Sequence, residues 1–180
     1  MKIAQQLREK NIAEYLIYMW QVEDLIRANG CDLDGMEQQL IARYPEEDRA
    51  ALREWYGNLI TQMREENVRE TGHLQINRNV IIRLSDLHRQ LLASPKYPFY
   101  SAVYFKALPF IVELRSRNGN KEEDELETCF EALYGVLLLR LQQKPISEGT
   151  ARAVEVISSL LSMLANFYDK EQKGELKFED

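Results

Sequence analysis

The sequence predicts an all-α fold: a single-domain bundle or array of about seven helices around a central apolar helix at residues 126–143. The first observation behind this is the apolar run LETCFEALYGVLLLRL, which starts at Leu126 and has acidic residues in front of it. Such a helix is expected to be buried on almost every side, which requires other helices around it. The second is that 180 residues contain only 8 Gly and 5 Pro, so long elements are expected. The third is that apolar residues recur at spacings of three and four elsewhere, without a strand pattern or a fixed repeat.

Two helices are predicted before residue 45. The first covers residues 3–28, where apolar side chains follow the helical period, and it ends at the turn-forming pair Asn29–Gly30. A short helix follows at residues 36–43. Asp34 is expected to cap it, with Glu37 completing a capping box.

Two longer helices follow. One extends from residue 46 to about residue 71 and starts with three acidic side chains, which are favourable at a helix N-terminus. Gly72 is its expected stop. The next helix covers residues 76–93 and is closed by Ser94–Pro95.

The helix expected at residues 98–117 contains Pro109, which removes a backbone hydrogen bond and should kink or divide the helix. A polar loop comes next, in which Asn120 and Glu123 form a second capping box ahead of the apolar helix.

The last predicted helix follows Lys144–Pro145, with Ser147 as its N-cap. The charged residues 174–180 are expected to fray. The domain organisation predicted is therefore one helical domain at residues 1–173 followed by this tail.

Charge and apolar content exclude several classes of function. The formal charge is −6, and 23 Lys and Arg are scattered among 29 Asp and Glu, so neither nucleic acid nor an anionic membrane is an expected partner. The apolar stretch 132–139 is much shorter than the about 20 residues of a membrane-spanning helix. The first residues are too charged for a signal peptide, and two cysteines fit a reducing compartment, so a soluble cytoplasmic protein is expected.

The histidines and cysteines offer only weak candidates for chemistry. Glu70 and His73 match half of the Glu-x-x-His pattern of di-iron bundles, which makes them the candidate metal ligands; the plainer interpretation is a histidine at a helix end. His88 is interpreted as a satisfied edge histidine. Cys129 is expected to be a buried small hydrophobe and Cys31 to lie in an exposed turn, so neither is expected to be activated. No catalytic residue and no cofactor is predicted.

Four polar side chains are candidates for a pocket near the apolar helix. Glu131 and Tyr134 lie on one edge of that helix, and Glu14 and Tyr18 lie in the first predicted helix. If they face inward they need partners, because an unpaired buried charge is costly. A solvated helix edge or a structural ion pair is the favoured alternative.

The segment KYPFYSAVYFKALPF carries six of the 15 Tyr and Phe residues. The favoured interpretation is that they fill the core. If a surface of this protein binds a partner, the expected interaction face is Tyr97, Tyr100 and Tyr104, which share one side of the helix at spacings of three and four.

Three segments resemble a known family. They are NIAEYLIYMWQVEDLIRA at residues 11–28, TGHLQINRNV at residues 71–80 and ETCFEALYGVLLLRLQQKPIS at residues 127–147. Together they resemble a family of uncharacterised bacterial proteins known only as a domain of unknown function, and the resemblance covers the whole chain. It implies a compact cytoplasmic helical protein, and it implies no activity, cofactor or catalytic residue.

Two functions from different classes remain. The first is a non-enzymatic helical domain that acts through protein association, including self-association. The alternative is a small-ligand-binding protein or a metal- or carboxylate-dependent enzyme with a pocket near the central helix.

Overall fold

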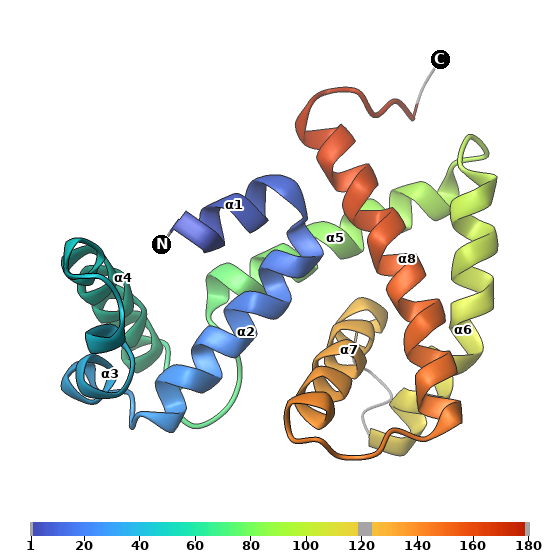
Figure 1. The fold of residues 1–180 in the computed structure, drawn as a ribbon. Helices are drawn as coiled ribbons and strands as arrows, with labels where there is room; N and C mark the ends of the chain where they lie inside the picture. The colour runs from blue at the N-terminus through green and yellow to red at the C-terminus, as the bar shows by residue number, and fades with distance from the viewer. Residues whose placement is uncertain (1, 119–123, 179–180) are drawn as a thin grey trace. The chain divides into compact units, whose positions relative to one another are not determined.

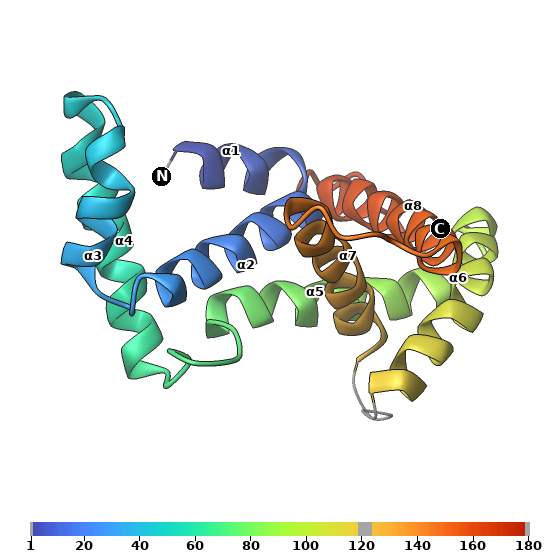
Figure 2. The same ribbon diagram turned by 60° about the horizontal axis from the view of Figure 1, so that its bottom comes forward.

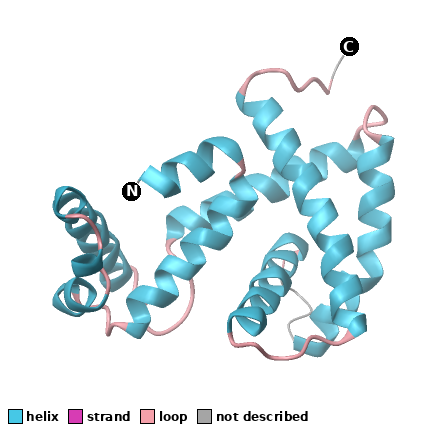
Figure 3. Ribbon diagram, viewed as in Figure 1, coloured by secondary structure: helices cyan, strands magenta, loops and turns pink. Residues whose placement is uncertain are grey.

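The computed structural model describes residues 2–118 and 124–178. Within them the chain forms eight α-helices and one short 3-10 helix, and no strand (Figures 1 and 3). The helices are α1 Lys2–Lys10, α2 Ile12–Ala28, α3 Leu33–Gln39, η1 Ile41–Arg43, α4 Glu46–Glu65, α5 Gln75–Ala93, α6 Pro98–Asn118, α7 Glu125–Leu141 and α8 Glu148–Gln172. The predicted all-α class is confirmed. Among the described residues, no helix has both the length and the apolar character that crossing a membrane requires.

The contacts within the chain divide it into two compact units. The first consists of Met1–Lys10 and Glu14–Val80, and the second of Asn11–Ala13 and Ile81–Asp180. The boundary between them in the sequence falls at the start of α2 and inside α5.

The predicted first helix at residues 3–28 is two helices, which raises the number of helices above the predicted seven. The interruption is at Asn11, whose side-chain Oδ1 accepts a hydrogen bond from the backbone N–H of Ala13 at 3.1 Å. Asparagine competes with the helix for backbone hydrogen bonds and favours the cap position. One residue therefore ends α1 and starts α2.

The core of the first unit is apolar and comes mainly from α2 and α4. Helix α3 and η1 pack against α4. The side chains that are almost completely buried there are Leu16, Trp20, Ile26, Met36, Ile41, Met63 and Leu74.

The capping residue of α3 is Asp32, not Asp34 as predicted. Its side chain accepts a hydrogen bond from the N–H of Gly35 at 2.9 Å, so the helix starts three residues earlier than expected. The predicted turn at Asn29–Gly30 is confirmed, with Gly30 at φ 69°. Cys31 is buried and not exposed as predicted. Its N–H donates to the carbonyl of Ile26 at 2.9 Å, and its Sγ lies 3.6 Å from the carbonyl oxygen of Arg69, in the connection between α4 and α5.

Helix α4 ends at Glu65, six residues before the predicted end. Asn67 takes the left-handed conformation with φ 58°, and its N–H donates to Arg64 while the N–H of Val68 donates to Met63. This pair of bonds is a Schellman motif, in which glycine is the usual left-handed residue and asparagine an occasional one. Gly72, the predicted stop, lies in the connection to α5.

The second unit is built from α6, α7 and α8 together with most of α5. Helices α6 and α8 lie side by side and make the most extensive contact, and α7 packs against both (Figure 1). The first half of α7 is buried through Leu126, Cys129 and Phe130. Its second half is only partly covered, and Leu141 is 65% exposed. The expectation that this helix is buried on almost every side therefore holds for its first two turns only, because its helical neighbours in the unit, α6 and α8, do not surround its C-terminal half.

Pro109 lies inside α6, which continues through it and changes direction along its length (Figure 2). The predicted capping pair Asn120 and Glu123 lies outside the described residues. The observed N-cap of α7 is Asp124, whose Oδ1 accepts hydrogen bonds from the N–H groups of Leu126 and Glu127. The predicted cap of α8 is confirmed, since the Ser147 hydroxyl accepts from the N–H of Thr150.

The segment after α8 makes contacts as far as its described residues extend. The hydroxyl of Tyr97 donates to the carbonyl of Lys177 at 2.6 Å, and the ring of Phe178 lies edge-on to the Tyr97 ring. The expected fraying of residues 174–180 stays a prediction.

The left-handed backbone conformation that follows α7 can be tested by substitution. Gln143 has φ 55°, a conformation that costs an L-residue about 1–2 kcal/mol and costs glycine almost nothing. We expect Gln143→Gly to raise the free energy of unfolding by about 0.5–1 kcal/mol in urea denaturation. Gln142→Gly is the matched control, because Gln142 has φ −84° and should lose stability. Equal effects of the two substitutions would contradict the assigned conformation.

Candidate functional site

Glu70 and His73, the candidate metal ligands, do not form a helical pair. Both follow the end of α4, and the Glu70 side chain is exposed. The carboxylate beside His73 belongs to Glu23 of α2, whose Oε2 lies 2.5 Å from Nδ1 of the imidazole.

Glu23 is the centre of a buried polar cluster in the first unit, which we call the Glu23 cluster and define as Trp20, Glu23, His73 and Asn77. The carboxylate is completely buried. Its Oε1 accepts hydrogen bonds from the N–H of Leu74 at 3.0 Å and from Nδ2 of Asn77 at 2.6 Å. The indole of Trp20 stacks on the His73 ring with centroids 4.1 Å apart.

The chemistry of the Glu23 cluster is that of a structural anchor. The carboxylate sits at the first turn of α5, where free backbone N–H groups favour a negative charge, and three donors satisfy it. It ties the connection between α4 and α5 to α2. The described residues contain no group of three or more His, Cys, Asp or Glu that could hold a metal ion, so His73 and Glu23 are a pair only.

Sequence reasoning missed Glu23. The available signal was its spacing: it lies three residues after Trp20 and three before Ile26, within the apolar stripe of its helix. A carboxylate in such a stripe needs buried donors, whereas the candidate Glu14 proves to be exposed.

A second polar cluster surrounds His88 in the second unit, and we call it the His88 cluster. The Nδ1 of His88 lies 2.5 Å from the Tyr100 hydroxyl, and the Tyr104 ring packs edge-on against the imidazole. The Tyr104 hydroxyl donates to Oε2 of Glu125 at 2.9 Å. Ser85 donates to the capping carboxylate of Asp124 at 2.9 Å. These bonds join α5 and α6 to the start of α7.

Burial shifts the pKa values of several side chains in and beside the His88 cluster toward their neutral forms. It lowers the pKa of His88, although the nearby carboxylates of Glu125 and Asp124 act in the opposite direction. Burial also raises the pKa of Tyr100, and burial together with the hydrogen bond to Glu125 raises the pKa of Tyr104 to about 12. The pKa of the Cys129 thiol is raised by burial as well, so the thiolate that a nucleophile requires is disfavoured.

The three tyrosines of the predicted interaction face point into the second unit. Tyr100 is fully buried, and Tyr97 and Tyr104 are half-buried with their hydroxyls donated to Lys177 and Glu125. The physical reason is that each hydroxyl finds an acceptor or a ring nitrogen inside the unit. These tyrosines therefore do not form a free surface.

The exposed apolar side chains of α6 lie on other positions. Phe99 is 82% exposed, Phe105 63% and Val112 55%. Ala102 and Pro109, which are also exposed, complete a series with spacings of three and four. We call this series the outer face of α6. The same periodicity in the sequence could have identified it.

The four candidate pocket residues are distributed over both units. Glu14 and Tyr18 belong to the first unit, and Glu131 and Tyr134 to the second. Burial raises the pKa of Tyr18, which is half-buried. That the four residues line one pocket stays a prediction.

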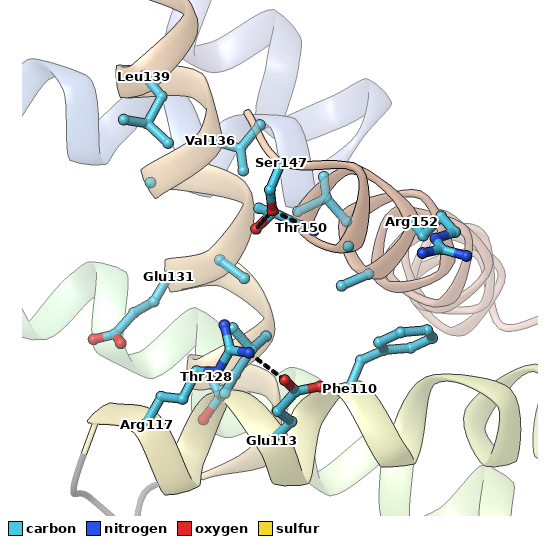
Figure 4. A pocket seen from close by; sticks show the side chains of 16 residues that line it. Phe110, Glu113, Arg117, Thr128, Glu131, Val136, Leu139, Ser147, Thr150 and Arg152 are labelled. Atoms are coloured by element: carbon cyan, nitrogen blue, oxygen red, sulfur yellow. Dashed lines mark hydrogen bonds and ion pairs between the residues drawn. The ribbon is translucent and has the colours of Figure 1, made fainter. Parts of the chain in front are cut away.

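Glu131 does line a cleft, which lies within the second unit between the C-terminal half of α6, the middle of α7 and the first turns of α8 (Figure 4). Its volume is about 780 Å³. Glu113 and Arg117 form an ion pair at 2.5 Å on one wall, and the Ser147 hydroxyl bonds to Thr150 at 2.9 Å on another. The cleft thus combines charged, hydroxyl and apolar side chains.

Comparison with known proteins identifies the family. A family model described as Domain of unknown function (DUF4924) matches residues 1–175, so the chain belongs to this family. The curated proteins give no match to the chain, and neither do the solved structures.

The geometry of the Glu23 cluster predicts that the carboxylate of Glu23, and not that of Glu70, contributes to stability through His73. We expect Glu23→Gln to lower the free energy of unfolding by about 3 kcal/mol or more, because it removes one member of a buried, hydrogen-bonded pair. Glu70→Gln is the matched control and should change stability by less than about 0.5 kcal/mol. Urea denaturation measures both. A larger loss for Glu70→Gln would mean that the pairing is misassigned.

The His88 cluster predicts a pH dependence of stability. Because the pKa of folded His88 is below its ordinary value of 6.5, the unfolded chain binds more protons as the pH falls through that value, and the free energy of unfolding falls with it. Between neutral and mildly acidic pH, we expect the free energy of unfolding to fall less steeply in His88→Gln than in the wild-type chain, although the variant is less stable at every pH. Denaturation curves at several pH values measure the difference. Parallel curves for the two proteins would rule out this role of His88.

Proposed function

We propose that this protein acts through protein association, and that the outer face of α6 binds the same face of a second copy. The observation that carries the proposal is the exposure of two phenylalanines and a valine along one side of a single helix. Isolated exposed apolar residues are normal on proteins, but a continuous apolar face is typical of interaction sites.

The composition of the helix supports an interface. Between Phe99 and Val112 the only charged residue of α6 is Lys106. Depletion of charge together with enrichment in aromatic residues distinguishes the cores of protein interfaces from other surfaces. The phenylalanines also carry no polar group that would favour water.

The binding partner that suits the outer face of α6 is a second copy of the chain, because this face is complementary to itself. In a two-fold antiparallel pair of α6 helices centred beside Phe105, Phe99 of one copy lies opposite Val112 of the other. Ala102 then lies opposite Pro109, so a small residue meets a ring. Lys106 lies beside the partner's Phe105, where an ammonium group is attracted by the aromatic face. Such an interface uses one patch twice, as two-fold dimers do.

The two histidine clusters support a non-enzymatic role. In both, the hydrogen bonds of the histidine or of its neighbours join different helices or connections of the unit. The alternative of small-ligand binding has its own support in the cleft of the second unit.

Light scattering after size-exclusion chromatography, over a series of concentrations, tests the proposal. The wild-type chain is expected to approach the mass of a dimer as concentration rises. Phe105→Glu should weaken association by about tenfold or more, since a charge would be buried against the partner. The matched control is Ile82→Glu on α5, because Ile82 is also apolar, is 54% exposed and lies off the outer face. A wild-type chain that stays monomeric at every concentration, or equal effects of the two substitutions, would contradict the proposal.

A further inference from the structure

The cleft between α6, α7 and α8 has the size and boundaries of a ligand site. Its volume of about 780 Å³ lies within the about 300–1,000 Å³ typical of pockets for small molecules. All three walls belong to the second unit, and its lining residues lie on three helices that pack against one another.

Small residues on two facing helices keep the cleft open. A Cβ atom added at Gly135 of α7 or at Gly149 of α8 would meet no atom within 4 Å. Ala132 and Ala153 line the same space. Both glycines are exposed, so the space beside them is open to solvent and is available to a ligand.

The cleft is apolar over much of its wall and charged at its margin. Phe110, Val136 and Leu139 supply apolar surface. In Figure 4, Val136 and Leu139 lie toward one end of α7, away from the ion pair that Glu113 and Arg117 form on α6.

One charged side chain at the margin of the cleft is available to bind a ligand. The Arg117 guanidinium already pairs with Glu113. Arg152, on α8, has no ion pair or hydrogen bond with any residue in the described part of the chain. The carboxylate of Glu131, which also lines the cleft, is not without a partner. The charge of the cleft that remains available is therefore the positive charge of Arg152.

From these features we propose that the cleft binds a small amphiphilic anion, with its apolar chain against Phe110 and Val136 and its anionic group at Arg152. A carboxylate and a phosphate monoester share this chemistry. A guanidinium binds either group through paired N–H donors. This binding site is independent of the outer face of α6.

Calorimetric titration of the full chain with four probes tests the chemistry. The probes are decanoate, decyl phosphate, decanol and acetate, each below its micellar concentration. At least one of the two amphiphilic anions is expected to bind about tenfold or more tightly than decanol and acetate. Decanol lacks the anionic group, and acetate lacks the long apolar chain. The stronger of the two identifies the head group. Equal binding of decanol, or no binding of either anion, would overturn the proposal.

Substitutions locate the site. Arg152→Gln should weaken anion binding about fivefold, whereas Arg78→Gln, a change at an exposed arginine of the first unit, should not. Gly135→Phe should abolish binding by filling the cleft, and Gly135→Ala is its control. If Gly135→Phe fails to fold, as judged by circular dichroism, Gly149→Phe fills the opposite wall. Binding that survives a folded filling variant would overturn the proposal.

Phe105→Glu separates this inference from the proposed function. The substitution removes the apolar centre of the outer face and leaves the cleft intact. Decanoate or decyl phosphate should bind this variant as tightly as the wild-type chain. Loss of binding in Phe105→Glu would place the amphiphile on the outer face and would overturn the cleft proposal.

Discussion

The hydrogen bonds of the α6 tyrosines determine which side of this helix faces its own unit. Tyr100 bonds to His88 and Tyr104 to Glu125, so the tyrosine side is held against α5 and the start of α7. A buried hydroxyl without a partner would cost about 1–3 kcal/mol, so each bond is required once the side chain is buried. Phe99 and Phe105 of the same helix then face outward, which reverses the usual preference of Tyr for the surface and of Phe for the interior. The outer face is thus a consequence of the polar cluster inside.

The same principle operates in the first unit. There a single buried carboxylate, Glu23, accepts hydrogen bonds from a side-chain amide and a backbone N–H beside the imidazole of His73. Both histidines of the chain therefore join segments that are distant in the sequence, one in each unit. Because the Glu23 carboxylate and the His88–Tyr100 pair contribute their hydrogen bonds to the fold, the sites that we propose for a ligand and for a partner lie elsewhere, in the cleft and on the outer face of α6.

Much of the helical pattern could be predicted from the sequence, because it depends on local periodicity. Helix α5 and the Ser147 cap of α8 are examples. The errors fell where several residues could serve as the cap or stop. Asp32 and not Asp34 caps α3, and α4 ends before Asn67 although it was expected to continue to Gly72. Periodicity also could not show which side of α6 is covered, since that depends on His88 and Glu125, which come from other parts of the chain.

The central claim is that two copies of the chain meet through their α6 outer faces. Isotope-filtered NOE spectroscopy on an equal mixture of labelled and unlabelled chains tests it without any substitution. The account predicts intermolecular NOEs between the Phe99 ring of one copy and the Val112 methyl groups of the other. Intermolecular NOEs confined to another face, or none at concentrations where light scattering shows a dimer, would contradict it.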